Sequence, residues 1–242
     1  MKEKELPLKI QGVQAKIVYY TYMGFNANTL LVSFNEKRRV LSTTDGYKKV
    51  KYVANAYVPY AVSEHFISSY KNFRKSFLEA LGISHDDLAL LSTGVNIDNL
   101  AICEQSFQEF SVCCMVTAGV KGNAQRVGVD TASYIEKNGE FLKISGTINI
   151  ILLTNAVLSV GSMARAIMTI TEAKTAALQD LDVRSTFTPQ CQATGTGTDN
   201  AIVVSGKSGE KIKFLGGHTK LGELIGFSTK NAVTEAIRLR KY

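Results

Sequence analysis

The fold is decided by Thr147-Ile-Asn-Ile-Ile-Leu-Leu-Thr-Asn-Ala-Val-Leu-Ser159 and Thr194-Gly-Thr-Gly-Thr-Asp-Asn-Ala201, which stand on either side of a predicted helix at about 162–181. A similar series occurs about a hundred residues earlier, from Val53-Ala-Asn-Ala-Tyr57 through a helix to Thr93-Gly-Val-Asn-Ile-Asp-Asn-Leu100. Asn55 matches Asn149, and the Thr-Gly and Asp-Asn pairs of the two loops coincide. We therefore predict two pseudo-equivalent β-α-β-β units, with both Thr-Gly loops near a shared cleft.

The rest of the chain supplies further strands and helices. β-Branched and aromatic residues predict strands over 15–23, 29–34, 39–42, 49–58, 88–91, 100–103, 110–117, 147–153, 201–205 and 211–215. Apolar residues at helical spacing predict helices ending at Leu81, near Leu181 and at the C-terminus. The predicted fold class is α/β (α+β), a single compact domain over 1–242 with internal halves of about 1–125 and 126–242. Its helices pack on a mixed sheet.

Composition limits the class of protein. With 242 residues, of which 45% are hydrophobic and 20% charged, the chain can bury the core of a globular domain. The charged first residues contain no apolar signal region, and glycine and asparagine interrupt the uncharged stretch 144–164. We therefore predict a cytoplasmic protein with no membrane partner.

Charge and cysteine content identify no partner or metal. The net charge of +7 is spread along the chain without a nucleic-acid motif, so a solvated surface is favoured over nucleic-acid binding. The four cysteines follow no metal or redox spacing and are interpreted as free thiols, with Cys113 and Cys114 on opposite faces of a strand. The three histidines are far apart in sequence, and we predict no metal site.

The loop Thr194–Asn200 is the first segment with candidate chemistry. It offers three hydroxyls, backbone amides and the carboxylate of Asp199, a set that suits recognition of an amide-rich ligand. The alternative is a tight structural loop in which Asp199 caps a turn. Asn123 adds a polar side chain at a strand end, where sites often gather.

Glu172 and His218 are further candidates. Glu172 is the only acid between Phe141 and Gln179, so it is either a base with a raised pKa or an exposed residue on a solvated helix face. His218 lies in a glycine-rich loop and can act as a general acid or base, or simply contact the start of the last helix. The pattern leaves both pairs of alternatives open.

Several segments together resemble the adenosylcobinamide amidohydrolase family. The matching stretches keep the family's order over most of the chain: Arg39–Thr43, Val116–Ala124, Gly146–Ile150, Thr171–Leu178, Ala193–Asp199 and Leu221–Ile225. The sequence departs from many relatives after Leu41-Ser-Thr43, where they carry a longer glycine-rich stretch. Each stretch alone is weak, and the ordered set is specific.

The resemblance implies hydrolysis of the amide that joins aminopropanol to the corrin ring of adenosylcobinamide. The products are adenosylcobyric acid and 1-amino-2-propanol, in corrinoid salvage for cobalamin biosynthesis. Cobalt belongs to the corrinoid substrate, so no protein cofactor is expected. The alternative is a non-catalytic corrinoid-binding or sensing protein on the same fold, and self-association into a homo-oligomer is left open.

The resemblance also marks positions for a site. Glu172 is expected to activate water, Lys174 or His218 to supply positive charge or the leaving-group proton, and Asp199 completes the predicted catalytic set. The loop 194–200 is expected to supply oxyanion donors. The predicted substrate-binding residues are Ser42, Thr43, Asn55, Asn123, Asn149, Thr194, Thr196, Thr198 and Asn200.

A second mechanism is less favoured. Gly146-Thr147 at the start of a strand is similar to the cleavage point of autoprocessing amidohydrolases, in which a threonine becomes the nucleophile after the chain is cut.

Overall fold

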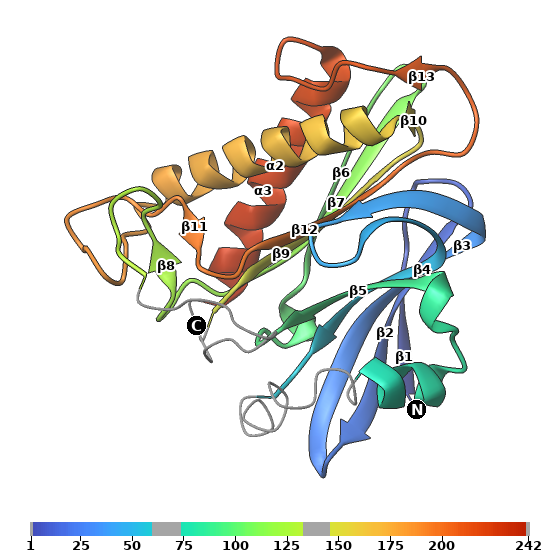
Figure 1. Ribbon diagram of the computed structural model, residues 1–242, viewed down its shortest axis with the longest axis horizontal. Coiled ribbons are helices and arrows are strands. Elements are labelled where there is room, and N and C mark those ends of the chain that lie inside the picture. The colour runs from blue at the N-terminus through green and yellow to red at the C-terminus, as the bar shows by residue number, and fades with distance from the viewer. Residues whose placement is uncertain (1, 60–73, 133–145, 241–242) are drawn as a thin grey trace.

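A nine-stranded mixed sheet forms the centre of the computed structural model, which describes residues 2–59, 74–132 and 146–240 (Figure 1). The strands follow the order β1-β2-β3-β12-β9-β7-β6, and β4 joins β3 to β5. Their bounds are β1 Lys2–Leu6, β2 Val13–Tyr22, β3 Phe25–Ser42, β4 Gly46–Tyr57, β5 Leu88–Thr93, β6 Ala101–Phe107, β7 Phe110–Ala118, β9 Ile148–Thr154 and β12 Asn200–Val204. The predicted α/β class with a mixed sheet is confirmed.

The sheet curls into two layers because β3 takes part in both. Residues Thr29–Ser33 of β3 pair with β2 along one side and with β4 along the other. Residues Val40–Ser42 of the same strand pair with β12. The register between β3 and β4 shifts between Ser33 and Arg38, and such irregularities let a strand bend. The separate strands predicted over 29–34 and 39–42 are therefore one bent strand of 18 residues.

Side-chain alternation along β9 shows what the two layers enclose. Ile150 and Leu152 pack into a core shared with α2 (Val160–Asp180) and α3 (Lys220–Leu239). Ile151 and Leu153 point the other way, into the core between the two sheet layers. All seven residues of β9 are buried, as expected for a strand covered on both faces.

Helices cover the two outer faces of the sandwich. Ser159 caps α2 by accepting from the Ser162 amide, and Thr219 caps α3 by accepting from the Gly222 amide, which fixes where each helix begins. On the opposite side, residues 74–81 form a helix whose Phe77 and Leu78 pack on the outer layer. The earlier part of that predicted helix lies outside the described residues.

Two short strand pairs mark the ends of α2. β8 (Ala124–Gln125) pairs with β11 (Gly195–Thr196) near its C-terminal end, and β10 (Val157–Leu158) pairs with β13 (Lys211–Ile212) near its N-terminal end (Figure 1). No helix in the described part of the chain is long and apolar enough to cross a membrane. The edge strand β1 escaped prediction because its Lys-Glu-Lys-Glu sequence is charged and exposed.

Each half contains one parallel β-α-β connection. β4 and β5 are parallel neighbours with the 74–81 helix between them in sequence, and β9 and β12 are parallel neighbours joined through α2. The matched asparagines meet in space, since Asn149 Nδ2 donates to Asn55 Oδ1 over 2.9 Å. Asn149 Nδ2 also donates to the carbonyl of Ser92 over 2.8 Å, so it reaches the residue before the Thr93-Gly94 loop.

Truncation of Leu152 tests the core assignment. Leu152→Ala removes a fully buried side chain between β9 and the helices and is expected to lower the free energy of unfolding by about 3 kcal/mol. Met168→Ala, at an exposed position of α2, serves as the control and is expected to change it by less than about 0.5 kcal/mol. Urea unfolding followed by circular dichroism measures both, and equal effects would contradict the packing described.

Candidate active site

An ion pair between Lys174 and Asp199 organises one end of the molecule. Lys174 Nζ on α2 lies 2.5 Å from Asp199 Oδ2, and both side chains are largely buried. The same carboxylate accepts from the amide of Ile148 at the start of β9 over 3.0 Å, and from the amide and hydroxyl of Thr196 over 3.0 and 2.5 Å. Asp199 therefore joins α2, β9 and the 194–200 loop.

The glycines of this loop are needed for close approach. A Cβ at Gly195 would lie 2.4 Å from Asp199 Oδ2 and 2.6 Å from Lys174 Nζ, so any side chain would separate the ion pair. A Cβ at Gly197 would lie 2.9 Å from Asn123 Oδ1. The Thr-Gly-Thr-Gly-Thr-Asp sequence therefore combines hydroxyls and a carboxylate with backbone that other groups can touch.

The peptide carbonyl of Gly146 receives two hydrogen bonds beside the ion pair. Asn123 Nδ2 donates to it over 2.8 Å and Thr198 Oγ1 over 2.9 Å. The next residue, Thr147, donates its hydroxyl to the carbonyl of Thr198 over 2.7 Å and lies 3.3 Å from Asn149 Oδ1. A carbonyl with two side-chain donors and an adjacent hydroxyl is an arrangement suited to acyl chemistry.

A buried chain of amides and hydroxyls supports Thr147 from within the sandwich. Asn55 Nδ2 donates to Thr117 Oγ1 over 2.9 Å, and Asn149 joins Asn55 to Thr147. Asn55, Asn149 and Thr117 are each at most 2% exposed, so their polar atoms face one another rather than solvent. Thr117 was not predicted as a site residue, although it lies in a stretch that matches the family.

The remaining predicted binding residues lie around this cluster. Thr43 donates to Asn200 Oδ1 over 2.8 Å, which ties the end of β3 to the start of β12. Ser42 is buried and bonds to Thr44. Thr194 accepts from the amide of Val127, so it anchors the chain next to β8.

Two predicted catalytic residues lie outside the cluster. Glu172 is exposed on α2, which corresponds to the solvated alternative stated for it. His218 is also exposed, and a Cβ at Gly216 would touch both His218 and Arg165. Arg165 precedes Lys174 by nine residues, or roughly 14 Å along a helix. The structure therefore does not bring His218 to Lys174, and the roles assigned to Glu172 and His218 stay predictions.

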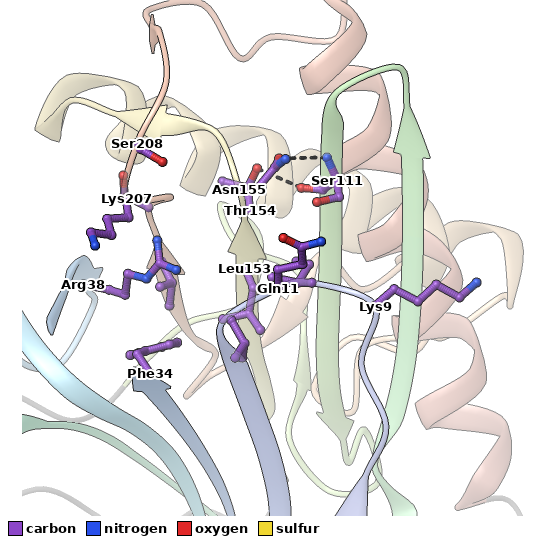
Figure 2. A pocket seen from close by; sticks show the side chains of 14 residues that line it. Lys9, Gln11, Phe34, Arg38, Ser111, Leu153, Thr154, Asn155, Lys207 and Ser208 are labelled. Atoms are coloured by element: carbon purple, nitrogen blue, oxygen red, sulfur yellow. Dashed lines mark hydrogen bonds between the residues drawn. The ribbon is translucent and has the colours of Figure 1, made fainter. Parts of the chain in front are cut away.

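A cavity of about 490 Å³ opens at the far end of β9. Arg38, Lys207 and Lys9 surround it together with Asn155, whose side-chain oxygen accepts from the amide of Ser111 (Figure 2). Burial lowers the pKa of Arg38, and nearby Glu36 opposes that shift. None of the predicted site residues lines this cavity, which lies roughly 20 Å along the strand from Thr147.

Comparison with known proteins assigns the family. The family model described as adenosylcobinamide amidohydrolase matches residues 12–242. This chain belongs to that family. An uncharacterized protein of Methanocaldococcus jannaschii is 49% identical over 219 residues, which are 86% of this chain and 85% of that protein. A Methanosarcina mazei protein named adenosylcobinamide amidohydrolase is 28% identical over 88% of this chain and 95% of its own.

Two solved structures are more distantly similar to this family member. The PH0078 protein of Pyrococcus horikoshii OT3 matches with a TM-score of 0.47 and 13% identity, covering 95% of this chain and 84% of its own. An L-aminopeptidase D-Ala-esterase/amidase from Ochrobactrum anthropi matches with a TM-score of 0.44 and 10% identity, covering 94% and 84%.

We expect loss of one partner of the buried Lys174–Asp199 pair to destabilise the protein more than loss of one partner of an exposed ion pair. Lys174→Met leaves the Asp199 carboxylate uncompensated and is expected to lower the free energy of unfolding by roughly 3 kcal/mol. The double variant Lys174→Met/Asp199→Asn is expected to recover part of that loss, because no buried charge remains. Lys230→Met, on α3, breaks the exposed pair with Asp180 at the end of α2 and is expected to cost less than about 1 kcal/mol. Thermal and urea unfolding would measure these differences, and equal losses for Lys174 and Lys230 would contradict the assignment.

The burial of each cysteine predicts whether a thiol reagent labels it in the folded protein. Burial raises the pKa of Cys113, and it raises the pKa of Cys114 to about 12, so neither thiol ionises appreciably at pH 8. Cys103 and Cys191 are only partly buried. A thiol reagent at pH 8 is expected to label those two in the folded protein and all four after denaturation. Rapid labelling of four thiols under native conditions would contradict the burial of Cys113 and Cys114.

Proposed function

We propose that this protein hydrolyses the amide that joins aminopropanol to the corrin ring of adenosylcobinamide, releasing adenosylcobyric acid and 1-amino-2-propanol for corrinoid salvage. Membership of the amidohydrolase family supports the reaction class. The observation that carries the proposal is the convergence of Asn123 Nδ2 and Thr198 Oγ1 on one carbonyl oxygen beside the Lys174–Asp199 pair.

Amide hydrolysis requires stabilisation of negative charge on the carbonyl oxygen of the tetrahedral intermediate. Asn123 Nδ2 and Thr198 Oγ1, which both point at one carbonyl oxygen, are donors of the kind that provide it. Lys174 places a positive charge in the same region, held by Asp199 at a defined position. In this proposal cobalt takes part only as a component of the substrate. The cytoplasmic location of the protein is a separate prediction.

An unsatisfied acceptor gives the site a further means of orienting a substrate. Asn123 is fully buried, and its Oδ1 accepts no hydrogen bond within the described structure. A buried amide oxygen without a donor is unfavourable, so a substrate N–H that reaches it gains a hydrogen bond. We assign Asn123 the task of aligning the amide, with Nδ2 toward the carbonyl oxygen and Oδ1 toward an N–H group.

The proposed reaction is tested by incubating purified protein with adenosylcobinamide and following both products by mass spectrometry. Equal amounts of adenosylcobyric acid and 1-amino-2-propanol are expected. Asn123→Ala is expected to lower kcat by roughly 10²–10³-fold, since it removes one oxyanion donor. Asn26→Ala, at an exposed asparagine of β3, is the matched control and is expected to keep wild-type kcat.

Two outcomes would redirect the proposal. Tight corrinoid binding without product would leave the alternative of a non-catalytic corrinoid-binding or sensing protein. Glu172→Gln and His218→Ala test the roles predicted for those residues, and a large loss of kcat in either would move the chemistry away from the Asn123–Thr198 donors.

A further inference from the structure

The two oxyanion donors are engaged by the protein's own backbone. Asn123 Nδ2 and Thr198 Oγ1 both donate to the carbonyl of Gly146, the residue directly before Thr147. A substrate amide can use these donors only when that carbonyl has moved. The peptide bond between Gly146 and Thr147 thus occupies the position in which an amide would react.

The backbone at this bond is held in an unusual conformation. Gly146 has φ +103°, in the region that favours glycine, and a Cβ there would lie 2.7 Å from the carbonyl oxygen of Gly119 and 3.2 Å from that of Lys121. On the other side, the amide of Gly119 donates to the carbonyl of Thr147 over 2.9 Å, and Asp199 holds the amide of Ile148. The bond is therefore held at the Gly146 carbonyl by Asn123 and Thr198 and, after the bond, by these contacts to Thr147 and Ile148.

We propose that Thr147 is the nucleophile of this protein and that its own hydroxyl first cleaves the Gly146–Thr147 peptide bond. Thr147 is 7% exposed, and its hydroxyl is already oriented by donation to the carbonyl of Thr198, with Asn149 Oδ1 3.3 Å away. A threonine with a free α-amino group carries its own general base, which is an established way to activate this weak nucleophile.

The cleavage proceeds in two balanced steps. Thr147 Oγ1 attacks the carbonyl carbon of Gly146, negative charge develops on the oxygen held by Asn123 and Thr198, and the C–N bond breaks. The hydroxyl proton passes to the departing nitrogen, which leaves an ester between Gly146 and Thr147 Oγ1 and a free α-amino group. One water molecule then hydrolyses the ester, giving a Gly146 carboxylate and restoring the hydroxyl of Thr147.

The same atoms then serve the proposed hydrolase reaction, and this part of the inference rests on the proposed function. Departure of the Gly146 carboxylate frees Asn123 Nδ2 and Thr198 Oγ1 for the substrate carbonyl. Thr147 Oγ1 attacks the substrate carbon while the α-amino group, with an ordinary pKa of about 7.7–8.0, accepts the hydroxyl proton and passes it to the leaving amine. Water hydrolyses the resulting ester to release the corrinoid acid.

The two fragments are expected to stay together after cleavage. β7 belongs to the fragment before the bond and β9 to the fragment after it, and the two strands pair over seven residues from Val112–Thr154 to Ala118–Ile148. β3 and β12 pair across the same division. A cleaved molecule would therefore elute as one particle on gel filtration and separate only under denaturing conditions.

Intact-mass spectrometry of the purified full chain tests the cleavage without any corrinoid. Two polypeptides are expected, residues 1–146 and 147–242, whose masses sum to that of the uncut chain plus one water, and N-terminal sequencing of the second should begin Thr-Ile-Asn-Ile-Ile. Thr147→Val, of nearly equal size, is expected to remain uncut and folded by circular dichroism, whereas Thr147→Ser is expected to cut. Thr21→Val, at an exposed threonine of β2, is the matched control and should cut like wild type.

The outcomes separate this inference from the proposed function. A folded wild-type chain that stays uncut while it hydrolyses adenosylcobinamide would overturn the cleavage and leave the substrate assignment in place. A chain cut at Thr147 that releases no product from adenosylcobinamide would support the nucleophile and contradict the substrate. Cleavage or full hydrolase activity in Thr147→Val would overturn the role of Thr147.

Discussion

The carboxylate of Asp199 is the group on which the geometry of the site depends. It is paired with Lys174 from the helix layer, and it accepts from the first amide of β9 and from two groups of its own loop. A buried carboxylate is stable only when its charge is compensated and its lone pairs are used, and these four contacts do both. The helix layer and the sheet are thereby locked together at the place where Thr147 enters β9.

The sandwich explains why this place is rigid. β9 is buried on both faces, so its residues are fixed by packing, and Thr147 directly precedes its first residue. The two asparagines matched by the internal repeat meet behind Thr147 and bond to each other, which extends the support from one half of the chain to the other. A reactive group at the end of an immobile strand, backed by a satisfied polar network, is well preorganised.

Most of the residues in the cluster are predicted from the sequence, and their catalytic roles stay predictions. The sequence marks the Thr194–Asn200 loop by its hydroxyls and carboxylate, Asn123 by its place at a strand end, and Lys174 by the family resemblance. The structure brings these residues together. Glu172 stands out in the sequence because its neighbours are apolar, yet on a helix those neighbours point elsewhere and Glu172 itself faces solvent. His218 lies near the N-terminal end of α2, away from Lys174. The distance between His218 and Lys174 in the folded protein cannot be read from their spacing in the sequence.

The family, the mixed α/β class, the principal helices and the strands rich in β-branched residues can be predicted from the sequence alone, because periodicity and ordered motifs are local properties of the chain. That 29–34 and 39–42 form one bent strand emerges only in the folded molecule, since a bend that joins two layers depends on partners distant in sequence. It is also only in the folded molecule that Asn123 and Thr198, 75 residues apart, both donate to the Gly146 carbonyl. Convergence of that kind depends on the directions of side chains on different elements, which spacing along one chain does not specify.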